Sequence, residues 1–312
     1  MTSQHRQIRE EKGNLMHIEQ KEAASILTPQ RQGFLASGPY PFTHALSGYL
    51  GCAFGQTTCG LYCYAQFLPN WQFRNASYAW GEAVTVKSNA PELLEKTLSR
   101  MKSEQRRRLR IFMSSTTDPY QPLEHKHEIT RRCLEVFACY QDLDTLVVQT
   151  RSPLAIRDLS LLQNIPYAWL SVTIETDDQS YLQQLKGGPP LAKRWELVRQ
   201  AHTQGIHTQI TVSPCLPYTS IEIFGQRLLN SGAERIVIDT MVEGDGSNGR
   251  RTARSPFAQA EPEWNNIDPA LHLYNYLCQQ DQDAGVTFGW STAGFCGIPP
   301  RYETHVEEAK LF

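Results

Sequence analysis

The chain of 312 residues has no excess of charge of either sign: 30 lysines and arginines stand against 32 aspartates and glutamates, for a net charge of −2. A protein that binds nucleic acid through its overall charge is basic, so that class is excluded and only local basic patches could serve. The apolar fraction of 40% and the charged fraction of 20% are those of an ordinary globular protein with a sizeable core.

The sequence also lacks an apolar run long enough to cross a membrane. Its beginning, MTSQHRQIREEKGNLMHIEQKE, is polar and contains no apolar stretch of the signal-peptide kind. These absences predict a cytoplasmic protein that does not bind membranes and whose thiols stay reduced. They favour metal binding or catalysis by the cysteines over disulfide formation.

Neither a solenoid repeat nor a low-complexity tract is present; short apolar runs alternate with helical patterns instead. This alternation predicts a parallel sheet with right-handed crossovers, either doubly wound or a full or partial barrel. Chemistry is then expected at the carboxyl ends of the strands. The predicted strands are Ala45–Leu50, Leu109–Ser114, Thr145–Thr150, Ala168–Ile174, Ile206–Val212 and Arg235–Asp239, and the predicted helices are Ala90–Gln105, His125–Tyr140, Pro153–Leu162, Leu191–Gln204, Ser220–Ser231 and Ala270–Gln282.

Three cysteines, Cys52, Cys59 and Cys63, fall within twelve residues of a glycine-rich loop after the first predicted strand. Structural zinc usually takes four protein ligands, often as two close pairs, and no second pair exists here. A zinc site would therefore need His44 or a distant cysteine. Three unrelated buried cysteines are a third interpretation, although this loop is a poor core segment. An iron–sulfur cluster held by three thiolates would leave one iron open to a substrate or cofactor.

The loop and its neighbours resemble the radical S-adenosylmethionine (radical SAM) enzymes, and more narrowly the branch related to spore photoproduct lyase. The C-x6-C-x3-C spacing is longer in both gaps than the usual C-x3-C-x2-C of that family, and glycines could give the loop the backbone freedom for a wider turn. The matching segments keep the family's order along residues 26–240: Ile26-Leu27-Thr28-Pro29, Gly48-Tyr49-Leu50-Gly51-Cys52, Leu61-Tyr62-Cys63-Tyr64-Ala65, Thr117–Glu124, Arg151-Ser152-Pro153-Leu154 and Ser213-Pro214-Cys215-Leu216-Pro217.

The resemblance implies an α/β fold of the partial (β/α)6 TIM-like type over residues 26–241. An N-terminal arm, residues 1–25, would precede this core. Residues 242–312 would add a long polar loop, mobile or covering the site, and a helix and tail packed on the barrel. The chain is expected to be a monomer. The implied cofactors are a four-iron, four-sulfur (4Fe–4S) cluster on Cys52, Cys59 and Cys63, and S-adenosylmethionine (AdoMet) at the open iron, with flavodoxin or ferredoxin as the electron donor.

The resemblance also implies which side chains touch the cofactor and the substrate. Tyr62 would lie beside the adenine, with core packing as an equal alternative. The remaining AdoMet contacts would come from Ser114, Ser115, Thr116, Thr117, Asp118, Ser171 and Thr173. Tyr64 and Cys215 are the predicted catalytic residues, with Cys215 as a redox-active or hydrogen-donating thiol. Arg151 could bind a carboxylate or phosphate, and Glu124 is expected at the mouth of the barrel or at a helix N-terminus.

The substrate is the open part of the prediction. Spore photoproduct lyases carry a Cys-Thr-Ser-Asp segment whose cysteine returns a hydrogen atom to the product. Here Ser115 takes that place, and an O–H bond is far stronger than an S–H bond, so a true spore photoproduct lyase is not expected. Hydrogen abstraction from a nucleic-acid base or lesion, radical modification of a peptide or small molecule, and a zinc-stabilised, non-enzymatic binding module are the alternatives.

Overall fold

The computed structural model describes residues 6–9, 15–74, 77–260, 266–280 and 285–302. Parts of the predicted arm, the polar loop, the last predicted helix and the C-terminal tail lie outside these residues. In the part of the chain so described, no helix is long and apolar enough to span a membrane.

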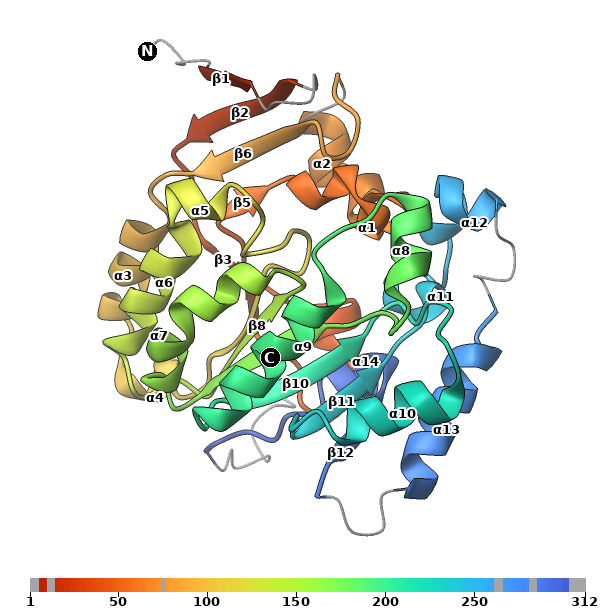
Figure 1. Cartoon of the computed structure of the whole chain (residues 1–312). Coiled ribbons are helices and arrows are strands. Elements are labelled where there is room, and N and C mark those ends of the chain that lie inside the picture. Colours follow the sequence, from red (N-terminus) through yellow and green to blue (C-terminus); the bar gives the residue numbers. More distant parts are fainter. Residues whose placement is uncertain (1–5, 10–14, 75–76, 261–265, 281–284, 303–312) are drawn as a thin grey trace.

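The main sheet has eight strands in the order β12-β11-β10-β9-β8-β7-β4-β3 (Figure 1). All neighbours run parallel except β3 and β4, which are antiparallel. A mixed α/β fold with a parallel sheet is thus confirmed, and the described strands do not close into a barrel. The strands are β3 (Leu27–Pro29), β4 (His44–Leu46), β7 (Arg110–Met113), β8 (Thr145–Thr150), β9 (Ala168–Thr173), β10 (His207–Val212), β11 (Arg235–Ile238) and β12 (Thr287–Trp290).

Helices connect the strands and cover one face of this sheet (Figure 1). Their buried apolar side chains, such as Leu94, Leu134 and Leu197, pack with Leu146 and Ile210 of the strands in one large core. The helices between the strands on this side are α3 (Ala90–Arg100), α4 (Ser103–Arg106), α5 (Glu124–His127), α6 (Ile129–Ala138), α7 (Leu159–Gln163, after the 3₁₀ turn Pro153–Asp158), α9 (Leu191–Thr203), α10 (Ile221–Leu229) and α13 (Asp268–Gln280). Helix α8 (Gln179–Leu185) lies instead beside the cysteine loop, where the Thr58 hydroxyl donates to Leu182 O.

The other face of the sheet holds a smaller core. Phe112 and Val237 project from β7 and β11 against Leu35 and Phe295, which come from the 3₁₀ turn η1 (Phe34–Ala36) and from α14 (Ser291–Phe295). These two segments lie far apart in the sequence and together fill one end of the space on this face. The space on this face that lies toward the carboxyl ends of the strands forms the cavity described below.

A second sheet of four strands lies beside the first, in the order β1-β2-β6-β5. It takes β1 (Arg6–Arg9) and β2 (Leu15–Lys21) from the predicted arm, together with β6 (Ala83–Lys87) and β5 (Tyr49–Leu50). The predicted single strand Ala45–Leu50 is therefore two strands in two sheets. The chain turns between them at Gly48, where a Cβ atom would lie 2.5 Å from Ile129 Cγ2.

Candidate active site

A cavity of about 420 Å³ opens at the carboxyl ends of the parallel strands. It receives side chains from the cysteine loop, from the ends of β7, β8, β9 and β11, and from the segment after β11. Most of the predicted site residues line it: Cys52, Cys59, Tyr62, Cys63, Tyr64, Ser114, Ser115, Thr116, Thr117, Asp118 and Thr173.

The cysteine loop folds as three short helices, which accounts for its long spacing. Cys52 precedes the 3₁₀ turn η2 (Ala53–Gln56), Cys59 lies in α1 (Thr58–Tyr62), and Cys63 separates α1 from the 3₁₀ turn η3 (Tyr64–Phe67). The extra residues allow η2 and α1 to cross at two glycines. A Cβ atom on Gly60 would lie 1.7 Å from the carbonyl oxygen of Gly55, so only glycine fits there.

All three thiols line the one cavity and influence one another electrostatically. Burial raises the pKa of Cys52 to about 12. A hydrogen bond with the Cys63 thiol lowers the pKa of Cys59, and the same bond, with burial, raises that of Cys63. Among the described residues, no group of three His, Cys, Asp or Glu side chains is arranged to hold a single metal ion. A donor set of three thiols suits an iron–sulfur cluster, which spreads its thiolates farther apart than a single ion does.

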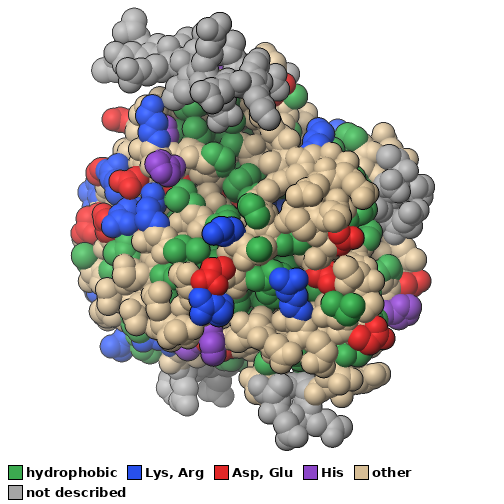
Figure 2. All heavy atoms as spheres, viewed as in Figure 1, with side chains coloured by type: hydrophobic (Ala, Val, Ile, Leu, Met, Phe, Trp, Pro, Cys, Tyr) green, Lys and Arg blue, Asp and Glu red, His purple; other side chains and the backbone are tan. Residues whose placement is uncertain are grey.

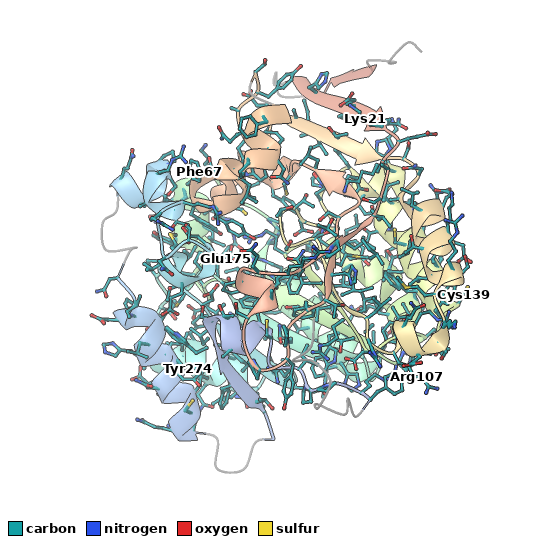
Figure 3. All side chains as sticks on the ribbon, turned by 180° about the vertical axis from the view of Figure 1, so that it is seen from behind. Lys21, Phe67, Arg107, Cys139, Glu175 and Tyr274 are labelled. Carbon is teal, nitrogen blue, oxygen red and sulfur yellow. The ribbon has the colours of Figure 1, made fainter. Side chains whose placement is uncertain are left out.

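A buried chain of charges borders the cysteine loop. Arg151, which follows β8, contacts the hydroxyl of Tyr62 at 3.2 Å and Glu175 Oε1 at 3.3 Å. Glu175 also pairs with Nη1 of Arg194, a residue only 1% exposed. Burial opposes ionisation of Glu175, but Arg194 and Arg151 outweigh it and lower the pKa of this carboxyl. Figure 3 shows Glu175 deep in the molecule. Arg151 thus reaches the cavity in a fixed position, with part of its guanidinium facing Tyr62.

The polar segment after β7 has two kinds of residue. Asp118 is structural: its carboxylate accepts hydrogen bonds from the Thr150 hydroxyl at 2.6 Å, from Tyr120 N at 2.8 Å and from Arg151 N at 2.9 Å. Ser114 has a left-handed backbone, with φ 65°, and its buried hydroxyl has no hydrogen-bond partner in the described chain. An unpaired buried polar group costs about 1–3 kcal/mol, and such groups often mark ligand sites. Ser114 is therefore available to a ligand, whereas Asp118 fixes the loop.

Asp239 is a cavity residue that the sequence analysis did not single out. It follows β11, is 2% exposed, and accepts a hydrogen bond from Ser213 Oγ at 3.0 Å through one carboxylate oxygen. Its other oxygen makes no well-formed hydrogen bond with a described residue, although the Ser291 hydroxyl lies close enough to favour the ionised carboxylate, and the buried side-chain oxygen of Gln149 has no partner in the described chain. Burial raises the pKa of Asp239 to about 7. Asp239 could have been identified from the sequence, because it lies one residue beyond the carboxyl end of a strand, where site residues gather in folds of this kind.

Two predicted site residues lie outside the cavity, and a third, Glu124, matches one of its two predicted positions. Ser171 is fully buried below the cavity, where it accepts a hydrogen bond from Gln209 Nε2 at 3.1 Å. Cys215 does not line the cavity, because its backbone N–H is fixed to Asp239 O and its side chain packs against the helix-side core. Glu124 is 0% exposed and accepts hydrogen bonds from Thr130 N and Arg131 N at the start of α6, so the predicted position at a helix N-terminus applies and the predicted position at the mouth does not.

The segment after β11 covers the cysteine loop and is not a structureless loop. It forms α11 (Met241–Gly244), a 3₁₀ turn (Thr252–Arg254) and α12 (Pro256–Ala260), and α12 packs against α1 (Figure 1). The ring of Phe257 meets that of Tyr62 edge-on at 6.4 Å. Asp245 organises the turn by accepting hydrogen bonds from four backbone N–H groups, those of Ser247, Gly249, Arg251 and Thr252.

Comparison with known proteins supports the fold and leaves the activity open. No family model matches the chain. It is 28% identical over 176 residues to the uncharacterized protein MJ0683 of Methanocaldococcus jannaschii, which covers 56% of this chain and 61% of that protein. It is 30% identical over 141 residues to the uncharacterized protein ORF301 of Acidianus two-tailed virus, or 44% of each chain. The chain thus spans about half to three fifths of the curated relatives it matches.

Among solved structures, the fold is similar to that of spore photoproduct lyase. One such structure, complexed with dinucleoside spore photoproduct, has a TM-score of 0.57 at 11% identity over 87% of this chain and 81% of that one. Another, with bound AdoMet and the same dinucleoside, has a TM-score of 0.54 at 12% identity over 83% and 80%. The chain therefore shares the fold of spore photoproduct lyase.

Proposed function

We propose that the protein is a radical SAM enzyme whose cavity binds a 4Fe–4S cluster on Cys52, Cys59 and Cys63 and AdoMet at the open iron. The observation that carries the proposal is the meeting of three thiols in one cavity at the carboxyl ends of a parallel sheet with this fold. When bound, the cluster would supply the electron that cleaves AdoMet to methionine and a 5′-deoxyadenosyl radical, which takes a hydrogen atom from the substrate.

The chain's own residues would bind and orient AdoMet. Arg151 presents a mostly buried guanidinium beside Tyr62, which suits the methionine carboxylate through charge-assisted hydrogen bonds. The unpartnered hydroxyl of Ser114 and the backbone of the Ser115–Thr117 segment offer polar contacts for the amino group. The ring of Tyr62, against which Phe257 packs edge-on, would give an aromatic surface for the adenine.

The far wall would hold the substrate. Asp239 and Gln149 both line the cavity, and each has a buried oxygen that makes no well-formed hydrogen bond with a described residue. The Gln149 oxygen accepts hydrogen bonds, and the Asp239 carboxyl accepts them when ionised and donates one when protonated, so the substrate would carry polar N–H or O–H groups. Tyr64 also lines the cavity, and its hydroxyl donates to Ser115 O at 2.6 Å.

The test is the reaction itself. The protein is purified and reconstituted anaerobically with iron and sulfide, then incubated with AdoMet and dithionite while 5′-deoxyadenosine is measured by mass spectrometry. The proposal predicts about four irons per chain and 5′-deoxyadenosine formation that is lost in Cys63→Ala. A colourless protein that holds one zinc and forms no 5′-deoxyadenosine would instead indicate a zinc-stabilised binding module.

A further inference from the structure

Among the described residues, two positively charged side chains line the cavity, and the proposed function uses one of them. Arg151 is assigned to the methionine carboxylate, whereas Arg251 has no role in that assignment. Arg251 follows α11 in the segment that covers the cysteine loop, and its side chain is partly buried. Burial raises the pKa of the Tyr64 hydroxyl, and the Arg251 guanidinium lies close enough to oppose this rise. Arg251 therefore faces the same space as Tyr64.

Most of the hydrogen-bond donors of Arg251 are free. Nη1 donates to the carbonyl oxygen of Asp245 at 2.7 Å, which fixes the position of the guanidinium. Nε and Nη2 have no partner among the residues that the structure describes. These two nitrogens form one edge of the planar guanidinium, and that edge can bind two oxygens of one anion at the same time.

Arg251 has no carboxylate partner either. Arg106, Arg110 and Arg194 are buried or partly buried, and each forms an ion pair. Figure 2 shows positive and negative side chains together on the surface over α3, α5 and α6 as well. Arg251 forms no ion pair with any described residue, and the Asp245 carboxylate is already bound by four backbone N–H groups. An unpaired guanidinium that is partly removed from water favours binding of an anion from outside the chain.

The surroundings of Arg251 favour a carboxylate over a phosphate. Burial opposes ionisation of Asp245, but hydrogen bonds from backbone N–H groups outweigh it and lower the pKa of this carboxyl, so this side of the cavity already carries a negative charge. Such a charge repels a phosphate dianion more than a carboxylate, which carries a single charge. Phe34 also lies against this turn, since a Cβ atom on Gly246 would be 3.5 Å from Arg251 Nη1 and 3.8 Å from Phe34 Cβ. A carboxylate ends a molecule and needs access from one side, whereas a phosphodiester continues on both sides.

Asp239 offers a polar contact near Arg251. It packs against the same segment, because a Cβ atom on Gly244 would lie 2.1 Å from Asp239 Oδ2. Tyr64 interacts electrostatically with both Asp239 and Arg251, so both side chains border the space beside its hydroxyl. The Asp239 carboxyl accepts a hydrogen bond when ionised and donates one when protonated. A ligand whose carboxylate is bound by Arg251 would thus present its neighbouring N–H or O–H groups to Asp239.

We infer that Arg251 binds a carboxylate of the substrate, which is therefore a small carboxylic acid that carries N–H or O–H groups, such as an amino acid derivative. This inference rests on the proposed function, because it concerns the substrate of the same cavity. A nucleic-acid base has N–H groups but no carboxylate, so radical modification of a small molecule becomes the favoured reaction. Arg251 is then a specificity-determining residue, and Arg151 remains the residue for AdoMet.

The experiment uses trifluoroacetate as a carboxylate probe and measures the line width of its fluorine NMR signal with the reconstituted protein. AdoMet is present in excess, so that Arg151 is occupied, and uncharged trifluoroethanol is the control probe. Wild type is compared with Arg251→Gln, which removes the charge, and with Arg251→Lys, which keeps the charge but loses the planar edge. Arg250→Gln is the matched control, because Arg250 is exposed, precedes Arg251 and does not line the cavity.

The inference predicts that wild type and Arg250→Gln broaden the trifluoroacetate signal to the same extent, and that Arg251→Gln reduces this broadening about fivefold or more. Arg251→Lys should lie between them. Trifluoroethanol should stay sharp with every protein, and acetate should displace trifluoroacetate at lower concentrations than dimethyl phosphate does.

Absence of broadening in wild type would overturn the inference, even if the Arg251 variants fail to fold. Equal broadening by Arg251→Gln would do the same, since the probe would then bind elsewhere. Loss of the wild-type broadening when AdoMet is added would overturn it by showing that Arg251 binds the carboxylate of AdoMet. Displacement by dimethyl phosphate at lower concentrations than acetate would overturn the choice of a carboxylate. A wild-type protein that binds no AdoMet in equilibrium dialysis would instead contradict the proposed function.

Discussion

Arg151 joins the cysteine loop to the parallel sheet through its contact with the hydroxyl of Tyr62 at 3.2 Å. Tyr62 lies one residue before Cys63, and Arg151 lies one residue after β8. The Arg151 guanidinium donates a hydrogen bond to Glu175, and Glu175 also accepts one from Arg194. A cation fixed in this way is already oriented for an anionic group that enters the cavity, so binding does not require it to be reoriented.

Replacing this arginine should weaken AdoMet binding. Arg151→Gln removes the charge, and Arg151→Lys keeps the charge but loses the planar fork. We expect the dissociation constant for AdoMet to rise about 30-fold or more in the glutamine variant and less in the lysine variant. Anaerobic equilibrium dialysis of the reconstituted proteins measures it. Arg106→Gln, which removes an ion pair with Asp142 far from the cavity, is the control and should bind AdoMet like wild type. Equal affinity in all four proteins would contradict this role for Arg151.

Separate substitutions of Cys63 and Cys215 test the two roles predicted for cysteines, that of a cluster ligand and that of a hydrogen donor. Cys63→Ala removes a predicted cluster ligand and should reduce iron to less than half of the wild-type content and abolish 5′-deoxyadenosine formation. Cys215→Ala should leave both within about twofold of wild type, because Cys215 does not line the cavity. Iron analysis and mass spectrometry give the two readouts. Loss of activity in Cys215→Ala with full iron content would restore the hydrogen-donor role predicted from the sequence.

The crossing of η2 and α1 makes Gly60 sensitive to a single methyl group. In Gly60→Ala the new Cβ would clash with the backbone of Gly55, which cannot move as a side chain can. We expect a loss of about 2–3 kcal/mol in the free energy of unfolding, of the size that overpacking causes, together with reduced iron loading. Gly205→Ala is the control: its Cβ meets open space but its φ of +71° disfavours alanine. That variant should lose stability and keep its iron, as shown by urea titration and iron analysis.

Asp239 should make stability depend on pH. Burial raises the pKa of this carboxyl to about 7, so the folded state holds its proton in a range where the unfolded chain has released it. The sign follows from linkage: stability due to this group is complete below pH 4 and falls as the pH rises from about 4 to 7. Asp239→Asn removes the effect, so the variant should gain about 2–4 kcal/mol relative to wild type between pH 5 and pH 8.

Urea unfolding of the cluster-free proteins at both pH values checks this, because the remaining titrating groups are common to the two proteins and cancel. The groups that influence Asp239 include Ser213, Ser291, Thr240 and Glu243, and Tyr64 also interacts with it electrostatically. A stability difference between variant and wild type that stays constant from pH 5 to pH 8 would mean that Asp239 is ionised throughout.

Much of this architecture could be predicted from the sequence because it depends on local patterns. β8 agrees with the prediction at both ends, and β7, β9, β10 and β11 differ by one residue or two, since short buried apolar runs that alternate with helical patterns are typical of parallel strands. The three cysteines were found because thiols so close together are rare in an ordinary core. Their meeting in one cavity follows from the strand end on which the loop lies.

What could not be predicted depends on contacts distant in sequence. The strand Ala45–Leu50 breaks at Gly48, where the side chain of Ile129, some eighty residues away in sequence, packs too close to leave room for a Cβ atom. The helical crossing in the cysteine loop depends on Gly55 and Gly60 touching each other, which spacing alone does not reveal. Asp239 looked like the end of a strand, and only the fold shows that it faces the cavity with one oxygen unpaired.

The central claim is that the three thiols of the cysteine loop hold a redox-active cluster that cleaves AdoMet. The most direct measurement is the yield of 5′-deoxyadenosine from the anaerobically reconstituted protein with AdoMet and dithionite, compared with Cys63→Ala. We predict 5′-deoxyadenosine in amounts that exceed the enzyme concentration, about four irons per chain, and neither in the variant. Full iron loading of the wild-type protein with no 5′-deoxyadenosine above the level of the variant would contradict the claim.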